Sequence, residues 1–277
     1  MTTLTDTYTL ANGHQIPKVG FGTWQIPAAD AKQAVQDAIA LGYRHIDTAL
    51  AYHNEAEVGA GIRESGVARE EIFVTSKLPA ESKTYKRALQ DFNTTMDNIG
   101  LDYIDLYLIH APRPWGEPGS NYDDENQAVW EAMEEIYASG RAKAIGVSNF
   151  NVHDLKSIMR QAEVKPMVDQ IQYYVGYTEP EITKFAKAQG LLVEAYSPLA
   201  TGALLQDSTL QQMAEQYHVS LAQLAIQFCV QNGVLPLPKA VQKAHIENNA
   251  DLDFVISDQD MALLNAMKDS TNRYHFS

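Results

Sequence analysis

Cysteine and basic residues are scarce in this chain. One cysteine, Cys229, occurs among 277 residues, which excludes an internal disulfide and is typical of a reducing compartment. Acidic residues outnumber basic residues 35 to 21, so the surface should repel nucleic acid and anionic membranes. An anionic ligand therefore needs a local basic site, for which the candidates are Lys239, Lys243 and His245.

Long apolar runs and targeting signals are also missing. No stretch approaches the roughly 18 uninterrupted apolar residues of a membrane span. The opening residues, MTTLTD, include neither the basic segment nor the apolar block of a secretory signal. We therefore expect a soluble, cytoplasmic protein without a membrane or nucleic-acid partner.

No linker or shift in composition divides the sequence into two cores. Apolar residues make up 45% of the chain, which is enough to bury a large core. A single α/β barrel takes about 250 residues, so the length fits one barrel. We expect one domain over residues 1–277.

Strand and helix patterns alternate along almost the whole chain. Asn12-Gly13 predicts a tight β-hairpin over residues 8–17 at the N-terminal end. Apolar runs then predict eight strands, at 19–21, 45–47, 72–76, 103–109, 144–148, 167–170, 191–196 and 234–237. Apolar residues at i, i+3 and i+4 predict helices between them, at 29–41, 55–64, 83–99, 125–139, 152–160, 179–189, 210–232 in two pieces and 243–250. A further helix is expected outside this pattern, at 258–268.

Eight strands joined by right-handed helical crossovers favour one architecture. They close into a (β/α)8 TIM barrel more readily than into a doubly wound open sheet, which is the alternative. The fold class is thus α/β, with an N-terminal β-hairpin and an extra C-terminal helix.

Polar side chains occur at most of the expected strand ends. The carboxyl ends of barrel strands surround the active site in enzymes of this architecture. The residues at these ends are Thr23-Trp24, Asp47, Lys77, His110, Ser148-Asn149, Gln170, Tyr196-Ser197 and Lys239. A purely structural barrel would also carry polar loop residues there, but the variety of groups favours a binding site. The longer connections at 111–124 and 197–208 are candidate walls of a substrate pocket.

Three of these residues, together with Tyr52 in the loop after Asp47, form a candidate proton-donating group. Tyr52 follows Asp47 by five residues, and Lys77 and His110 end the next two strands. A phenol is a poor acid at neutral pH unless a cation lies against it. Lys77 is that cation, Asp47 would hold it charged, and His110 can donate to the same substrate oxygen. The group suits reduction of a carbonyl, but no side chain carries hydride, so a nicotinamide cofactor is required.

Two other patterns in the chain have competing interpretations. Residues 20–25, GFGTWQ, match only part of a dinucleotide fingerprint, so glycines that permit a tight turn are the favoured interpretation. His45 and Asp47 share a strand face and, with His110, could bind a catalytic metal in a barrel hydrolase. Lys77 would compete for Asp47, so no metal is expected. A non-catalytic, nucleotide-binding barrel with a redox-sensing role is the third possibility.

The sequence resembles the aldo-keto reductase family. Residues 42–49, GYRHIDTA, with Glu55, Val58 and Gly59, are similar to the first signature of that family. Residues 143–150, KAIGVSNF, resemble the second signature, and Leu237-Pro238-Lys239 opens the third. The resemblance covers residues 8–253 in consistent order. The loop after Tyr196 is shorter than that of the animal aldose reductases. In this respect the chain is more similar to bacterial members, especially the 2,5-diketo-D-gluconate reductases.

The resemblance implies a monomeric barrel that reduces small carbonyl compounds with NADPH. It implies that Tyr52 is the general acid, Lys77 and Asp47 its tuning pair and His110 the orienting donor. Substrate would lie against Trp24, Tyr52, His110 and Trp115, with residues 273–276 as a mobile edge. The implied cofactor site consists of Gly22, Thr23, Trp24, Asp47, Ser148, Asn149, Gln170, Tyr196, Ser197, Pro198, Leu199, Lys239, Ala240, Val241, His245, Asn248 and Asn249.

The chain departs from the family pattern at three positions. Ala111 follows the catalytic histidine where a tryptophan is usual, which alters one pocket wall. Ala240 replaces a hydroxyl residue and His245 replaces an arginine in the third signature. Both changes weaken the recognition of a 2′-phosphate, so we expect that NADPH is still accepted and that NADH is also used to a useful degree. The sequence does not identify the physiological carbonyl compound or the stereochemical preference.

Overall fold

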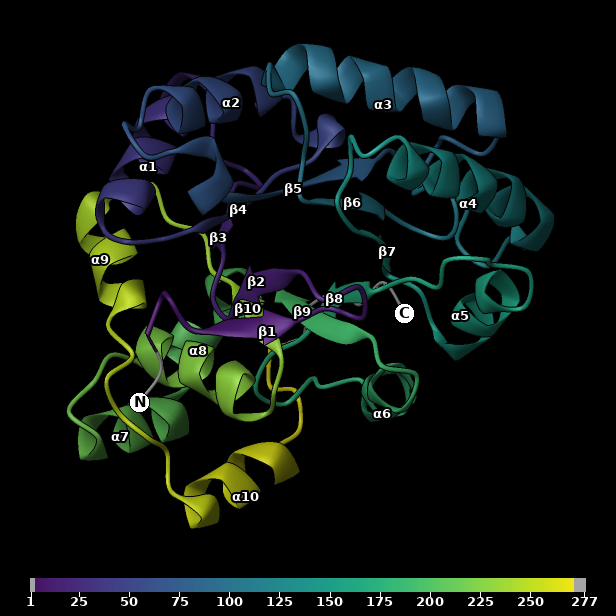
Figure 1. Cartoon of the computed structure of the whole chain (residues 1–277). Coiled ribbons are helices and arrows are strands. Elements are labelled where there is room, and N and C mark those ends of the chain that lie inside the picture. Colours follow the sequence, from purple (N-terminus) through teal and green to yellow (C-terminus); the bar gives the residue numbers. More distant parts are fainter. Residues whose placement is uncertain (1–2, 272–277) are drawn as a thin grey trace.

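Eight parallel strands pair in sequence order to form a barrel (Figure 1), in a computed structural model that describes residues 3–271. The main-chain N–H groups of Gly20 and Gly22 donate to the carbonyls of Pro236 and Pro238, each at 3.0 Å, and so join the first strand to the last. The predicted barrel is confirmed, and the open-sheet alternative is not. The strands are β3 (Phe21–Gly22), β4 (His45–Asp47), β5 (Phe73–Leu78), β6 (Leu106–Ile109), β7 (Ile145–Ser148), β8 (Val168–Gln172), β9 (Leu192–Tyr196) and β10 (Leu235–Leu237).

Helices follow the strands and cover the outside of the barrel, as Figure 1 shows. They are α1 (Ala28–Ala40), α2 (Glu55–Arg63), α3 (Tyr85–Ile99), α4 (Asp123–Ala138), α5 (Val152–Met159), α6 (Pro180–Ala188), α7 (Ser208–Gln216), α8 (Leu221–Gln231), α9 (Lys243–Ala250) and α10 (Asp258–Ala266). The predicted 210–232 helix is indeed two helices, α7 and α8. Ser220 caps α8 by accepting from the Gln223 N–H at 3.2 Å, which fixes the break between them.

An antiparallel hairpin closes the end of the barrel where the strands begin. Its strands are β1 (Thr7–Thr9) and β2 (Gln15–Pro17), so the predicted hairpin is present, but residues 10–14 connect the strands in place of a tight two-residue turn. Leu10 and Ile16 of the hairpin pack in one buried cluster with side chains from the early positions of the strands, including Phe73, Leu106 and Leu235. The lower interior is therefore a dry apolar plug.

The upper interior is polar. Residues two positions apart in a strand point to the same side. In β4, β5, β8 and β9, the inward residues beyond the apolar layer are Asp47, Lys77, Gln170 and Glu194, and their side chains are buried. Ionisable groups inside a barrel are costly unless they are paired, so this layer marks the functional end.

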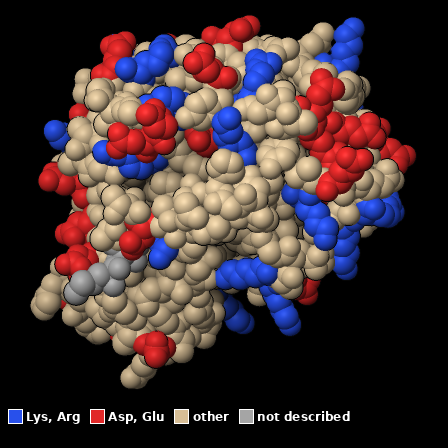
Figure 2. All heavy atoms as spheres, viewed as in Figure 1, with Lys and Arg blue, Asp and Glu red and all other residues tan. Residues whose placement is uncertain are grey.

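The surface shows the acidic excess of the sequence unevenly. Figure 2 shows acidic side chains gathered over α4, which carries them at both ends, and lysine and arginine side chains dispersed elsewhere on that face. None of the helices in the described part of the chain combines the length and apolar character that a membrane crossing requires.

Replacing Glu194 by glutamine should flatten the dependence of stability on pH. Burial, with a further contribution from Asp47, raises the pKa of Glu194 from 4.5 to about 8. The folded protein thus holds a proton that the unfolded chain has already lost, and the stabilisation this proton gives declines as pH rises. The decline is at most about 1.4 kcal/mol per pH unit, from roughly pH 4.5 up to roughly pH 8.

Thermal melts of the parent and Glu194→Gln across this range test the point. The variant should melt close to the parent near pH 5 and above it at about pH 8.5, because glutamine has no proton to lose. Parallel curves for the two proteins would contradict a buried, neutral carboxyl group.

Candidate active site

A buried ion pair lies at the centre of the polar layer. Lys77 is 0% exposed, and its Nζ donates to Asp47 Oδ1 at 2.7 Å and to the Thr48 carbonyl at 2.9 Å. Burial alone would lower the pKa of Lys77, but the charge of Asp47 and the interactions of the ammonium with Asp47 and Tyr52 outweigh burial, so the pKa is raised. The lysine is therefore a permanent cation at neutral pH.

Tyr52 belongs to a short loop and lies next to the Lys77 ammonium. The loop after β4 forms one 3-10 turn, Leu50–Tyr52, and His53 ends the turn with φ of 56°. Asn54 anchors the loop by donating to the carbonyls of Thr23 and Ile26. The Tyr52 hydroxyl consequently lies 3.3 Å from Lys77 Nζ.

The phenol of Tyr52 keeps its proton. Burial raises its pKa, and the positive charge of Lys77 acts in the opposite direction. The sequence analysis assigned Lys77 the task of favouring the phenolate, and its charge does act that way, but burial is the larger effect. Tyr52 is thus a protonated acid with a stabilising cation beside it.

His110 completes the group of four. Its ring lies edge-on to Tyr52, with ring centroids 5.6 Å apart. Burial, reinforced by the charge of Lys77, holds the pKa of His110 well below its usual range, so the ring is neutral. Nδ1 is buried without a partner among residues 3–271. An unpaired N–H there would be costly, so the proton belongs on Nε2, as a donor toward a ligand.

A cleft of about 1410 Å³ opens over the carboxyl ends of the strands. It is lined by nearly all the residues that the sequence predicted for substrate or cofactor: Gly22, Trp24, Asp47, Tyr52, His110, Trp115, Ser148, Asn149, Gln170, Tyr196, Ser197, Pro198, Leu199, Lys239, Ala240, Val241, His245, Asn248 and Asn249. Thr23 and Lys77 lie behind its wall. The Thr23 hydroxyl donates to the Asp47 carbonyl at 2.9 Å, so it supports the wall. The predicted mobile edge, residues 273–276, lies outside the described residues.

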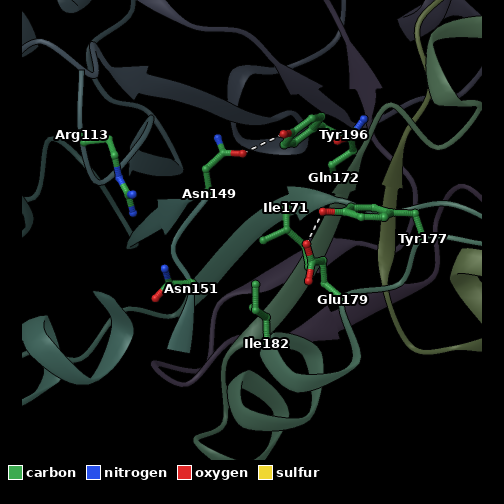
Figure 3. Close-up of a pocket in the computed structure, with 9 residues that line it drawn as sticks. All are labelled: Arg113, Asn149, Asn151, Ile171, Gln172, Tyr177, Glu179, Ile182 and Tyr196. Atoms are coloured by element: carbon green, nitrogen blue, oxygen red, sulfur yellow. Dashed lines mark hydrogen bonds between the residues drawn. The ribbon is translucent and has the colours of Figure 1, made fainter. Parts of the chain in front are cut away.

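One end of the cleft offers a flat ring and several amide groups. The Tyr196 hydroxyl donates to Asn149 Oδ1 at 2.7 Å, which holds the ring in place (Figure 3). Asn149 Nδ2 donates to the His110 carbonyl at 2.9 Å and to Ser148 Oγ at 3.0 Å. Asn149 needs a left-handed backbone here, with φ of 62°, which asparagine tolerates better than most residues. An aromatic plate beside amides suits a nicotinamide ring and its carboxamide.

The other end of the cleft suits the rest of a dinucleotide. Left-handed backbone at Ser197, Ala200 and Thr201 curls the loop after β9 along the cleft wall. Lys239 and His245 are exposed and also line this cleft, and His245 belongs to the first turn of α9. The long cleft, the amide end and these cations together fit a nicotinamide dinucleotide.

The loop after β6 is positioned by a buried lysine that the sequence analysis did not single out. Lys83 Nζ donates to the Ala111 carbonyl and to Asn126 Oδ1, each at 2.9 Å. Burial lowers the pKa of Lys83 to about 7. Ala111 is fully buried, and Trp115 lies edge-on against His110 with ring centroids 5.3 Å apart. Trp115 therefore supplies an aromatic wall beside the position where the family usually has a tryptophan.

Glu194 is a second residue that the sequence analysis missed. Gln170 Nε2 donates both to Asp47 Oδ2, at 2.9 Å, and to Glu194 Oε2, at 2.8 Å. A signal was present, because Glu194 precedes Tyr196 by two residues in a predicted strand and must share its face. The group of four thus extends across the barrel through Gln170.

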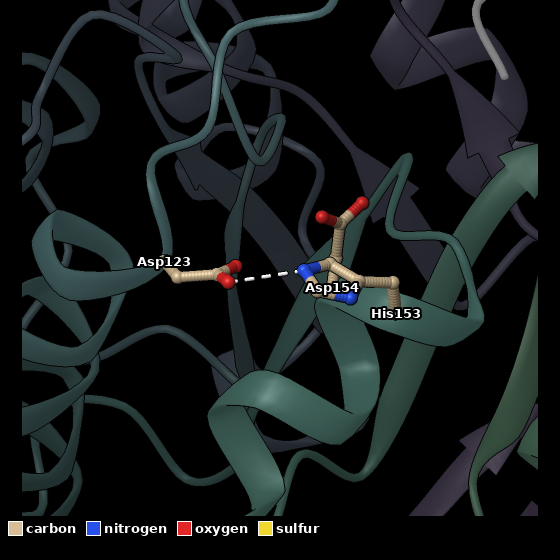
Figure 4. A group of neighbouring side chains, drawn as sticks. All are labelled: Asp123, His153 and Asp154. Atoms are coloured by element: carbon tan, nitrogen blue, oxygen red, sulfur yellow. Dashed lines mark hydrogen bonds and ion pairs between the residues drawn. The ribbon is translucent and has the colours of Figure 1, made fainter.

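The side chains considered for a metal are engaged in other contacts. His45 Nε2 is hydrogen-bonded to Thr75 Oγ1 at 3.0 Å, and Asp47 is shared by Lys77 and Gln170. Within residues 3–271, the acidic and histidine side chains near enough to share an ion are Asp123, His153 and Asp154, on α4 and α5 (Figure 4). Asp123 pairs with His153 at 3.0 Å, and Asp154 pairs with Arg113 at 3.3 Å. None of these three residues lines the cleft.

Comparison with known proteins agrees with this geometry. Residues 18–269 match the aldo/keto reductase family. A glyoxal reductase of Bacillus subtilis is 42% identical over 268 residues, which cover 96% of this chain and 94% of that protein. A morphine 6-dehydrogenase of Pseudomonas putida is 38% identical, over 93% of this chain and 90% of that protein.

Solved structures show the same barrel. An aldo-keto reductase from a deep-sea metagenome superposes with a TM-score of 0.90 at 37% identity, covering 98% of this chain and 97% of that one. An aldo-keto reductase of Bombyx mori in complex with NADP gives a TM-score of 0.86 at 32% identity, over 96% and 92% of the two chains. The chain therefore belongs to the aldo/keto reductase family and is an NAD(P)H-dependent carbonyl reductase.

Proposed function

We propose that Tyr52 is the acid that protonates the carbonyl oxygen during reduction of a small aldehyde or ketone to an alcohol. A bound nicotinamide supplies the hydride to the carbonyl carbon. Tyr52 donates its proton to the oxygen as negative charge develops there, and the ammonium of Lys77 stabilises the phenolate that remains. Asp47 keeps Lys77 charged and fixed, and the Nε2–H of His110 orients the oxygen by a second hydrogen bond.

The observation that carries this proposal is the position of the Tyr52 hydroxyl. It lies 3.3 Å from a lysine ammonium that is itself buried and paired with Asp47. A structural tyrosine has no need of a buried cation, which is costly to keep inside a protein. Because the pKa of Tyr52 is raised by burial, the proton is present at neutral pH and leaves only when a stronger base forms.

The side chains at the mouth of the cleft indicate the substrate class. Trp24 and Trp115 stand there 44% and 42% exposed, next to Tyr52 and His110. Two exposed aromatic side chains favour compact carbonyl compounds with an apolar part. The names of the relatives, a glyoxal reductase and a morphine 6-dehydrogenase, support carbonyl and alcohol chemistry without choosing one substrate. A compound like 2,5-diketo-D-gluconate is also a compact carbonyl compound, although it has no apolar part. We infer that the chain works as a monomeric, one-domain cytoplasmic enzyme.

Tyr52→Phe should abolish most turnover without loss of cofactor binding. Removal of a positioned acid lowers turnover by roughly 10²–10⁴-fold. The measurement is the decay of NADPH absorbance with a panel of small aldehydes, ketones and dicarbonyls. Tyr85→Phe, on the exposed surface of α3, is the matched control and should behave as the parent does. Near-normal turnover of Tyr52→Phe would rule out Tyr52 as the acid.

We propose NADPH as the cofactor, with NADH used to a useful degree. Lys239 supplies a point charge for a 2′-phosphate, but Ala240 offers no hydroxyl group at its side. His245 can stack on an adenine, yet it lacks the permanent charge and forked donors of an arginine. Binding of the part that both cofactors share should therefore survive, while discrimination by the phosphate is weakened.

His245→Arg should strengthen NADPH binding by about 1–2 kcal/mol and leave NADH binding nearly unchanged, the difference expected of a charge-assisted hydrogen bond. Dissociation constants of both cofactors for the parent and the variant measure this. A strong NADPH preference in the parent, unaltered by arginine, would show that His245 has no part in the choice.

A further inference from the structure

Glu194 stands out because nothing in the proposed chemistry uses it. Its carboxyl group is 0% exposed in the barrel interior, next to the Asp47–Lys77 pair. One of its oxygens, Oε1, has no hydrogen-bond partner within residues 3–271. A leucine would fill such a position with less cost in stability, since an unsatisfied buried polar atom is unfavourable. The retained carboxyl group therefore calls for a functional reason.

The contact that Glu194 does make is with Gln170. A glutamine amide has two N–H hydrogens and one oxygen. Gln170 Nε2 gives its hydrogens to Asp47 Oδ2 at 2.9 Å and to Glu194 Oε2 at 2.8 Å. Asp47 also accepts from Lys77, so its carboxylate can only accept from Gln170. The amide group is thereby held in one orientation, with both hydrogens directed into the barrel.

The orientation leaves Gln170 Oε1 as the free end of the amide. Gln170 lines the cleft, and its Oε1 accepts no hydrogen bond from the part of the chain that the structure describes. The neighbouring Asn149 has both amide hydrogens engaged, with the His110 carbonyl and Ser148 Oγ. Gln170 therefore presents an acceptor, ready for an N–H group of a ligand.

We propose that Glu194 is a positioning residue for the nicotinamide: together with Asp47 it holds the Gln170 amide so that Oε1 accepts from the carboxamide N–H of the cofactor. This inference rests on the proposed function, since it concerns the same cofactor. Without an acceptor at position 194, one hydrogen of Gln170 would be unsatisfied in a dry interior, and the amide could turn to find another partner. Turning the amide would present hydrogens where the cofactor also presents hydrogens.

The experiment compares two cofactors that differ at one group. In the 3-acetylpyridine analogue of NADPH an acetyl group replaces the carboxamide, so the carbonyl is kept and the N–H donors are lost. Affinity for both is measured by quenching of tryptophan fluorescence, without turnover. Glu194→Leu removes the acceptor, and Glu194→Gln keeps one through its own Oε1. Asp169→Leu, a buried acid on the opposite face of β8 that does not line the cleft, is the matched control.

Glu194→Leu should bind NADPH roughly tenfold more weakly, the scale of one buried hydrogen bond, and should bind the analogue within about twofold of the parent. Glu194→Gln should restore NADPH binding to within about twofold. Asp169→Leu should change both affinities by the same factor. Glu194→Met, whose unbranched chain follows the same path, replaces the leucine variant if that variant does not fold.

Three results would overturn the proposal. The first is an equal loss of affinity for both cofactors in Glu194→Leu, and the second is no loss of affinity for either. The third is a glutamine variant that binds NADPH as weakly as the leucine variant does. Each of these results differs from a failure of the proposed function. If the proposed function were wrong, the parent itself would not bind NADPH or would not reduce carbonyl compounds. A parent that binds and reduces normally isolates the role of Glu194.

Discussion

The buried ion pair between Lys77 and Asp47 is the interaction on which the rest of the site depends. Two charges inside a protein are tolerated only when their remaining hydrogen-bonding capacity is satisfied. Lys77 directs its three hydrogens to Asp47, the Thr48 carbonyl and Tyr52, while the second oxygen of Asp47 accepts from Gln170. This requirement fixes the relative positions of β4, β5 and β8 and of the loop that carries Tyr52. The contacts that we propose for catalysis are thus the same contacts that make the buried charges tolerable.

The barrel lowers the free-energy cost of this arrangement because its interior is divided into an apolar part and a polar part. The hairpin and the early strand positions form an apolar plug around residues such as Ile16 and Leu108. Above it, polar side chains lie at the cleft, where we propose that a cofactor and substrate complete their hydrogen bonds. His110 and Glu194 each keep one buried polar atom without a partner in the described chain, and both lie in this upper part.

Much of the fold followed from local patterns in the sequence. Helices such as α9, Lys243–Ala250, were predicted to the residue, and the Asn-Gly turn located the hairpin. Boundaries were less certain at the first barrel strand. It is Phe21–Gly22, which begins two residues later and ends one residue later than the predicted strand at 19–21. Apolar residues continue outside the ladder there, so hydrophobicity alone does not set the end of a strand.

The candidate site was predictable where chemistry falls at a strand end and less so where it lies within a strand. Asp47, Lys77, His110 and Gln170 were visible because polar residues interrupt apolar runs at such ends. Glu194 lies inside an apolar strand, and its contact with Gln170 depends on register between β8 and β9, which one sequence does not give. Lys83 was missed for a similar reason, since its partner Asn126 is 43 residues away in the chain.

The most direct test of this account is the effect of Lys77→Met on the hydride-transfer step, measured in a single turnover from prebound NADPH. Methionine follows the path of the lysine stem without its charge, so Tyr52 would lose the cation that stabilises its phenolate. We expect the rate to fall by about 10²-fold or more at pH 7, with the NADPH dissociation constant nearly unchanged. A Lys77→Met enzyme that transfers hydride at a near-normal rate at pH 7 would contradict the central role of the buried pair.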